Sequence, residues 1–535
     1  MEKTLIIAPT DNVAVALSKL DKGDIIELSS GNIILKESIP VKHKLALKNF
    51  RKHDIIRMYG VPVGEAMVDI PSGYKITTEN IKHLAAAYSI SDFNYKYQIP
   101  DIEYFKKKTF SGFYRNDGQV GTANYWIVVP LVFCQNRNLK VLREVFETEL
   151  GFKKENNYKL QLRSLIKGEH FENIVEHKNR VFENIDGIKF LEHHGGCGGT
   201  REDAQTLINL LAGYIKNPNV AGATVLSLGC QHAQMSLLKE ALEKNEVNRH
   251  KPVYYFEQQA FETEHQMLSE IIDTTYKALC EANQHQRQPA TLDKLTIGLE
   301  CGGSDGFSGI SANPLIGLVS DKITGVGGST ILSEFPELCG VEQDLIDRSV
   351  DRSVAERFVS LMEAYNKKAK QVGSGFEMNP SPGNIKDGLI TDAIKSAGAA
   401  TKGGRSPIYD VLDYAEYIKY KGLNLLCTPG NDVESTTGLA GSGANLILFS
   451  TGLGTPTGNP ICPVIKISSN SMLPERMKDI IDFDAGRLFS QGLSLETLSE
   501  ELIDVIIAVA SGEMKTKAAL LEQDDFIPWK RGVSL

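Results

Sequence analysis

The side chains best suited to chemistry lie in residues 299–314, LECGGSDGFSGISANP, where acid, thiol, hydroxyl and amide groups alternate with glycines. Glycine costs about 1 kcal/mol per residue in a helix interior, so this run predicts a loop that bends or touches a ligand. Residues 294–300, KLTIGLE, predict a buried strand just before it. Open α/β sheets place small-molecule chemistry where a strand enters such a loop, so we expect an active-site segment here.

Glu300 and Asp305 are the two acids of this segment, five residues apart. Together they could hold a hard cation or transfer protons. In the alternative interpretation Asp305 only caps the turn that follows it.

Four more glycine-rich junctions follow predicted strands, and parallel strands would bring their carboxyl ends into one crevice. Taken singly, each could equally be a tight connection with a capping residue. The GLAGSGAN and GLGTPTG loops could bind an anion through backbone N–H groups. The junctions are HHGGCGGTRED (193–203), GCQHAQ (229–234), TPGNDVESTTGLAGSG (428–443) and STGLGTPTGNP (450–460).

Histidines and cysteines stand in two of these junctions. His193 and His194 could supply a metal ligand, an acid or a base, although an isolated histidine is more often structural. Cys197 and Cys230 could ligate iron, but filling a small space in the core is the favoured interpretation.

Composition restricts the function further. The chain has 535 residues, a formal net charge of −9 and 42% hydrophobic residues. It lacks a basic run of the kind that binds nucleic acid, and an apolar stretch of the roughly 18 residues needed to span a membrane. Its eight cysteines form no CxxC pair, which argues against a disulfide scaffold or a structural zinc site. We therefore expect a cytoplasmic protein with a small-molecule ligand and without a nucleic-acid or membrane partner.

Patterning predicts a multidomain chain, with one all-β module followed by two α/β domains. Short β-type runs separated by Gly, Asp and Asn turns predict the module over residues 1–85, and residues 86–111 predict an extended linker. Strands that alternate with amphipathic helices predict mainly parallel, Rossmann-like sheets over residues 112–290 and 291–535.

Several motifs in their order along the chain resemble those of the altronate dehydratase and galactarate dehydratase family. The resemblance covers essentially the whole chain, and residues 1–85 look like that family's SAF module, a β-clip domain. The motifs are GLECGGSDGFSGISANP (298–314), NPSPGN (379–384), PGND (429–432), LAGSG (439–443), FSTGLGTP (449–456), KISSNS (466–471) and DFDAG (482–486).

The resemblance implies loss of water from a six-carbon sugar acid, yielding 2-dehydro-3-deoxy-D-gluconate from D-altronate, and dependence on iron(II) or manganese(II). A base would remove the C2 proton, an acid would protonate the leaving 3-hydroxyl, and a cation would stabilise the aci-carboxylate. The implied metal ligands are Cys301, Asp432, Glu79 and Cys230. The implied catalytic residues are His43, Lys44, His193, His194, Glu300 and Asp305. The implied substrate contacts are Ser304, Asn313, Asn431, Ser442, Thr455 and Asn124.

Four positions, in three motifs, depart from the family pattern. Thr77 and Glu79 stand where members often carry histidines, Ala123 stands where many have arginine, and Gln231 replaces a glutamate. These changes leave open a galactarate dehydratase, another aldonate or aldarate dehydratase, or a non-catalytic sugar-acid-binding paralogue. The sequence also leaves open whether the chain forms a homodimer.

Overall fold

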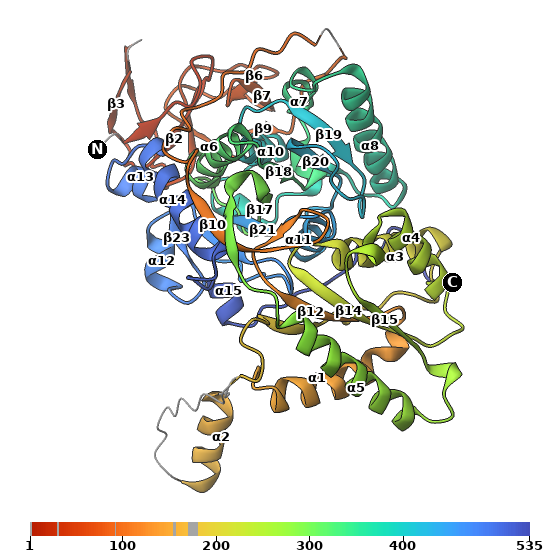
Figure 1. Cartoon of the computed structure of the whole chain (residues 1–535). Coiled ribbons are helices and arrows are strands. Elements are labelled where there is room, and N and C mark those ends of the chain that lie inside the picture. The colour runs from red at the N-terminus through yellow and green to blue at the C-terminus, as the bar shows by residue number, and fades with distance from the viewer. Residues whose placement is uncertain (1–2, 29–30, 91–92, 154–156, 169–179) are drawn as a thin grey trace. The chain divides into compact units, whose positions relative to one another are not determined.

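The computed structural model describes residues 3–28, 31–90, 93–153, 157–168 and 180–535 (Figure 1). The chain divides into two compact units. Unit 1 comprises Met1–Gly112 and Pro289–Trp529, and unit 2 comprises Phe113–Gln288 and Lys530–Leu535. The N-terminal module therefore shares one unit with most of the second predicted α/β domain (residues 291–535), which we call the third segment.

The N-terminal module is built of short antiparallel strands, as its turn-rich sequence predicts. One sheet has the order β1-β2-β5-β8, another β6-β7-β9, and β3 pairs with β4 alone. Its strands are β1 (Thr4–Leu5), β2 (Val13–Ala16), β3 (Ile25–Leu28), β4 (Gly31–Ile34), β5 (Lys44–Ala46), β6 (Ile55–Met58), β7 (Val61–Ala66), β8 (Lys75–Ile76) and β9 (Ile81–Lys82).

One face of this module packs against the third segment. Val13, Ile56 and Ile76 belong to the same buried apolar cluster as Phe307 and Ile394. Burial of apolar surface contributes roughly 25 cal/mol per Å², so this shared core holds the module and the third segment together.

The described part of the linker has neither helix nor strand between Leu84 and Lys108. Tyr95 donates a hydrogen bond to the Arg405 carbonyl at 2.8 Å, and Ser406 donates to the Tyr97 hydroxyl at 3.1 Å. The linker is therefore an extended segment that lies on the third segment. It leads into β10 (Thr109–Tyr114), which pairs with β11 (Val120–Gly121).

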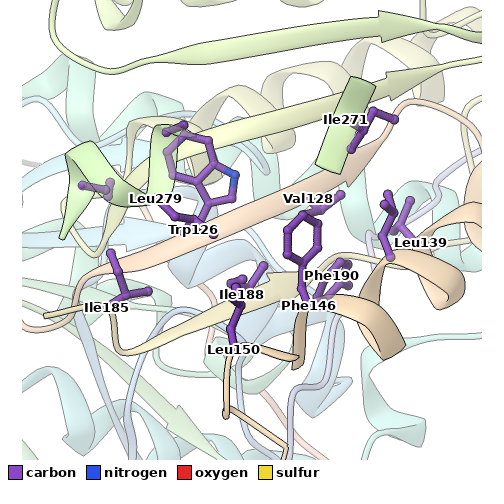
Figure 2. Packing of buried hydrophobic residues seen from close by; sticks show 14 of the residues in the cluster. Trp126, Val128, Leu139, Phe146, Leu150, Ile185, Ile188, Phe190, Ile271 and Leu279 are labelled. Atoms are coloured by element: carbon purple, nitrogen blue, oxygen red, sulfur yellow. The ribbon is translucent and has the colours of Figure 1, made fainter. Parts of the chain in front are cut away.

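Unit 2 contains a parallel four-stranded sheet in the order β13-β12-β14-β15, made of β12 (Tyr125–Pro130), β13 (Gly187–Phe190), β14 (Val220–Ser227) and β15 (Val253–Glu257). Trp126 and Val128 on β12 pack with Phe146 and Ile271 in its core (Figure 2). The hydroxyls of Thr200 and Thr263 cap two of its helices. The helices are α1 (Asn136–Glu149), α2 (Asn157–Lys167), α3 (Arg201–Lys216), α4 (Met235–Lys244) and α5 (Glu264–Ala282).

The third segment begins with β16 (Gln288–Thr291) and forms a fully parallel seven-stranded sheet in the order β19-β20-β18-β17-β21-β22-β23. Its strands are β17 (Thr296–Cys301), β18 (Ser329–Leu332), β19 (Ile408–Leu412), β20 (Gly422–Leu426), β21 (Leu446–Thr451), β22 (Val464–Ser468) and β23 (Phe483–Asp484). Residues 297–301 of β17 are buried, as expected for a central strand.

Helices connect these strands, and α6 and α14 pack against each other. They are α6 (Ala312–Gly325), α7 (Glu342–Asp347), α8 (Arg352–Gln371), α9 (Pro382–Lys386), α10 (Asp392–Ala400), α11 (Asp432–Gly441), α12 (Met472–Arg476), α13 (Arg487–Ser490), α14 (Leu495–Ala510) and α15 (Lys517–Leu520). The predicted fold class, an all-β module followed by parallel α/β domains, is confirmed. None of the helices in the described ranges is both long and apolar enough to cross a membrane.

Candidate active site

The centre of the seven-stranded sheet is the place where its strand order reverses. The chain passes from β17 to β18 on one side, and β21 later pairs with β17 on the other side. In open parallel sheets, ligands bind in the crevice outside the carboxyl ends of the strands at such a point. The loop predicted to be the active-site segment begins here, directly after β17.

Buried ionisable side chains gather at these strand ends. Glu300 and Cys301 end β17, Glu334 and Glu337 follow β18, and Lys402 lies in a short turn after α10. We call these five residues, together with Lys395 of α10, the carboxylate–lysine cluster. All six side chains are buried.

Close contacts hold the cluster together. The Lys402 ammonium donates to the Cys301 sulfur and to Glu334 Oε2, both at 2.6 Å. Lys395 Nζ lies 2.7 Å from Glu337 Oε1, and the Cys301 thiol donates to Glu337 Oε2 at 3.1 Å. Two carboxylates are therefore paired with two ammonium groups.

These contacts and the burial of the cluster shift the pKa values of its acidic groups. Burial tends to raise the pKa of Glu337, but the charges of Lys395 and Lys402 outweigh it and lower that pKa below its usual value. Burial and the charge of Glu334 raise the pKa of Glu300 well above its usual value. Burial followed by the charges of Glu334 and Glu337 does the same to the Cys301 thiol pKa. Burial and the charge of Glu337 also raise the pKa of Glu334, so the protonated form is favoured at both carboxyls and most strongly at Glu300.

Glu300 is also held in place by hydroxyl groups. Its Oε2 accepts hydrogen bonds from Ser333 at 2.7 Å and from Ser435 at 2.6 Å. Its Oε1 has no hydrogen-bond partner within the described residues, and neither does Glu334 Oε1. Glu334 Oε1 can therefore still accept from a ligand or bind a cation, and the Oε1 of protonated Glu300 can donate its proton to a ligand.

Asp432 and Lys466 form a second pair of groups beside the cluster. Burial raises the pKa of Asp432 to about 7 and lowers that of Lys466 to about 7. The Lys466 ammonium lies 3.3 Å from the centroid of the Phe449 ring, and among the described residues it makes no hydrogen bond. A Cβ built on Gly302 would lie 2.1 Å from Asp432 Oδ2, so only glycine there leaves room for this carboxylate. Groups with a pKa near 7 are suited to proton transfer.

Asp305 belongs to a separate group that joins the module to the sheet. Its Oδ1 accepts from the backbone N–H groups of Phe307 and Ser308, at 3.1 and 2.9 Å, which is the capping arrangement of the alternative interpretation and not the predicted catalytic role. Its Oδ2 pairs with the Lys42 ammonium at 2.8 Å and accepts from Asn470 at 3.1 Å. Asp305 is thus a buried junction between the module and the loop after β17.

His43 and Lys44 lie next to that junction. The His43 ring Nε2 is 3.1 Å from the Lys386 carbonyl, and the buried Lys44 ammonium donates to the carbonyls of Lys42 and Gly388, at 3.2 and 2.6 Å. Burial lowers the pKa of Lys44 to about 7. The described contacts give Lys44 a role in holding the module's loop.

Most of the predicted substrate-binding residues of unit 1 are buried or already form hydrogen bonds within the protein. Asn431 caps α11 by accepting from Val433 and Glu434, and Asn313 donates to the Gly398 carbonyl at 3.0 Å. Ser304 and Ser442 are buried, whereas Thr455 is partly exposed.

The predicted metal ligand Glu79 is exposed in the turn between β8 and β9. It belongs to neither of the two groups of described side chains whose ligand atoms lie close enough to share a metal ion.

The remaining predicted site residues lie in unit 2. His193 is buried with both ring nitrogens bonded to the backbone, at Pro130 and Gly195, and burial lowers its pKa to about 4. Asn124 is buried and donates to backbone carbonyls, whereas His194 is exposed.

Cys197 and Cys230 are both exposed. The favoured interpretation that they fill space in the core is therefore wrong, because their glycine-rich loops lie at the surface.

Sequence reasoning missed Glu334, Glu337, Lys395, Lys402 and Lys466. One signal was available, because Lys466 interrupts the apolar strand PVIKIS and a charged side chain in a buried strand needs a special reason. The others lie far apart in the sequence, and only the fold brings them together.

Comparison with known proteins defines the class. The family model described as D-galactarate/altronate dehydratase, C-terminal, matches residues 292–534. The second domain of D-galactarate dehydratase/altronate hydrolase matches residues 112–283, and the altronate/galactarate dehydratase SAF domain matches residues 2–84. The chain is therefore a dehydratase of the carbon–oxygen lyase type.

Three curated relatives are similar over nearly the whole chain. The altronate dehydratase of Bacillus subtilis is 33% identical over 100% of both chains, and that of Escherichia coli is 33% identical over 98% of both. The galactarate dehydratase (L-threo-forming) of Escherichia coli is 29% identical over 95% of this chain and 92% of its own length. This chain belongs to the altronate/galactarate dehydratase family.

Proposed function

We propose that this protein removes water from D-altronate to give 2-dehydro-3-deoxy-D-gluconate, in a reaction that depends on iron(II) or manganese(II). The observation that carries the proposal is the set formed by partly exposed Asp432, buried Lys466 and the buried carboxylate–lysine cluster at the switch point of the sheet. Altronate is favoured as the substrate because both full-length relatives at 33% identity are named altronate dehydratases.

Three side chains of the carboxylate–lysine cluster could hold a divalent cation in place of their present contacts with the Lys402 and Lys395 ammonium groups. Cys301, Glu334 and Glu337 offer ligand atoms that all lie within 4.8 Å of one another, and Glu334 Oε1 has no partner among the described residues. A mixed sulfur and oxygen set suits iron(II) or manganese(II) better than magnesium. When bound, the cation would stabilise the negative charge that develops on the substrate carboxylate.

The chain's own residues supply the proton transfers in this proposal. Uncharged Lys466, without a hydrogen bond in the described structure, accepts the proton from C2. Asp432 donates a proton to the leaving hydroxyl, and the protonated Glu300 donates to a substrate oxygen. Their burial keeps water from competing for these protons.

The other predicted residues keep supporting roles in the proposal. His43 stays a candidate for proton transfer, and Ser304 and Thr455 are candidate contacts for sugar hydroxyls. Lys42 and Asp305 join the module to the loop after β17, so they position that loop.

The test is anaerobic assay of metal-stripped protein with iron(II) or manganese(II) against altronate, galactarate, gluconate and mannonate, scoring 2-keto-3-deoxy acid. Altronate turnover that requires added metal would support the proposal in full. Preference for galactarate would replace the substrate, and it is a real alternative because a galactarate dehydratase is 29% identical. Binding of an acid without turnover would identify a non-catalytic paralogue.

A further inference from the structure

A second group of metal-ligand side chains lies apart from the residues used in the proposed reaction. The ligand atoms of His83, Cys339 and Asp392 all lie within 4.8 Å of one another. His83 directly follows β9 of the N-terminal module, Cys339 follows the short helix Phe335–Leu338, and Asp392 is the first residue of α10. Three separate segments of unit 1 therefore meet at this group.

Asp392 is the most unusual member. Its side chain is only 1% exposed, and neither of its carboxylate oxygens accepts a hydrogen bond from the described residues. The Cys339 thiol lies beside this carboxyl without a well-formed hydrogen bond to it. Burial and the charge of Glu337 raise the pKa of Asp392 well above its usual value, which favours the uncharged carboxyl. A buried carboxyl without a well-formed hydrogen bond still requires an explanation in a native structure. A bound cation would provide one.

His83 presents a nitrogen with an available lone pair. Its Nδ1 accepts a hydrogen bond from the backbone N–H of Ala393, the residue after Asp392, at a long distance of 3.3 Å. An accepting ring nitrogen carries no proton, which is the form that ligates a metal. So long a hydrogen bond is weak and easily exchanged for a metal bond.

The surroundings of the group favour a cation and give it a path. Glu342 and Glu377 act electrostatically on Cys339, and Glu377 also acts on His83. Among the groups that act most strongly on Asp392 is the cationic Lys395, whose ammonium is already paired with Glu337 at 2.7 Å. His83 and Cys339 are both partly exposed, so an ion can reach them from solvent.

We propose that His83, Cys339 and Asp392 bind a zinc-class divalent cation that fastens the last strand of the N-terminal module to the loop before α7 and to α10. One nitrogen, one sulfur and one carboxylate oxygen form a set that suits tetrahedral zinc, with water as the fourth ligand. On binding, the Cys339 S–H bond and the Asp392 O–H bond break, sulfur–metal and oxygen–metal bonds form, and both protons pass to solvent. The ion's role is structural, because it joins two parts of unit 1, and it is independent of the proposed dehydration.

The test is zinc and cobalt(II) binding to metal-stripped full-length protein. Wild type should take up one more zinc equivalent per chain than either His83→Gln or Cys339→Ser, and zinc should raise the Tm of wild type more than that of either variant. Cobalt(II) should give a thiolate-to-metal charge-transfer band that Cys339→Ser reduces. Cys280→Ser, which removes an exposed cysteine, is the matched control and should behave as wild type.

Two results would overturn the proposal of a zinc site at His83, Cys339 and Asp392. If Cys301→Ser abolishes the whole charge-transfer band and Cys339→Ser leaves it intact, the only thiolate ligand is in the carboxylate–lysine cluster and the proposal fails. Equal zinc uptake by wild type, His83→Gln and Cys339→Ser would also overturn it. Circular dichroism of each variant in chelator verifies folding, and if Cys339→Ser is unfolded, His83→Gln decides, because its partly exposed ring tolerates the change.

Discussion

At the scale of single residues, the site depends on charges held where water does not reach them. Glu334 adopts a left-handed backbone conformation with φ of 66°, which is rare for a residue with a side chain and costs about 1–3 kcal/mol. The conformation places its carboxylate 2.6 Å from the Lys402 ammonium. Removing one partner of such a buried pair costs about 3–5 kcal/mol of folding stability. The ion pair can therefore offset the backbone strain at Glu334.

Substitution of Asp432 should lower the activity without changing the stability of the protein. Asp432→Asn keeps the size of the side chain but removes its proton, so we expect kcat to fall about 10²- to 10⁴-fold with Tm nearly unchanged. If Asp432 is the proton donor, wild-type activity should fall as the pH rises through about 7, the pKa to which burial raises this group. Steady-state kinetics across pH measure both effects.

Glu434→Gln is the control for this substitution. Glu434 lies in the first turn of the same helix, is partly buried and should leave kcat near the wild-type value. Equal losses in the two variants would mean that α11 tolerates no change there, and Asp432 would lose its assigned role.

Lys44 should make stability depend on pH. Burial lowers its pKa from 10.5 to about 7, so between these values the unfolded chain binds a proton that the folded chain lacks. Its burial is therefore most destabilising below pH 7, and this effect fades as the pH rises to about 10. Wild type should gain up to about 1.4 kcal/mol per pH unit relative to Lys44→Met over this window. Denaturant unfolding measures this slope, and a constant difference would contradict the assigned pKa.

At the scale of secondary-structure elements, the loop after β17 and the start of α11 approach too closely for any side chain at Gly302. A Cβ there would lie 2.1 Å from Asp432 Oδ2 and 2.6 Å from the Phe449 ring. Gly302→Ala must therefore displace Asp432, and misplacement by about 1 Å can cost 100-fold in rate. We expect at least that loss in kcat/KM, measured by steady-state assay.

Gly383→Ala tests whether any added methyl group would have this effect. A Cβ at Gly383 would make only ordinary contacts, at 3.7 Å to Ser381 Oγ and 3.8 Å to Leu453 Cδ1. Activity should remain close to wild type. A comparable loss in both variants would show that the effect is not specific to the approach of β17 and α11.

At the scale of the whole molecule, the N-terminal module shares one apolar core with the loop after β17 and with α10 of the third segment. Ile56 of the module and Ile394 of α10 belong to the same cluster and are 0% and 1% exposed. Ile56→Ala and Ile394→Ala should each cost about 2–5 kcal/mol. Because the core is shared, both should lower the same calorimetric transition.

Ile271→Ala supplies the contrast. Ile271 lies in the core of unit 2, so its substitution should act on the transition of that unit. If Ile56→Ala instead produces a separate early transition while Ile394→Ala does not, the module unfolds on its own, and the shared core contributes little.

Particular residues show which parts of the structure could be predicted from the sequence. The buried strand 294–300 and the glycine-rich loop after it were predictable because apolar runs and glycine clusters are local patterns. The capping role of Asp305 was among the weighed alternatives, since Asp caps are also local. Lys402 and Glu334 were not predictable, because their pairing joins residues 68 apart in sequence through the parallel sheet.

The sequence by itself determined the family, the all-β module followed by parallel α/β domains, and the strand-to-loop segment at Glu300. Its motifs and periodicities involve residues close together in the sequence, so they can be recognised without a structure. Only the tertiary structure decided which charged side chains lie in contact with one another. It paired Lys402 with Glu334 and Lys395 with Glu337, and it brought His83 of the module to Cys339 and Asp392. The physical reason is that burial and pairing of ionisable groups depend on contacts between distant segments, which no window of sequence contains.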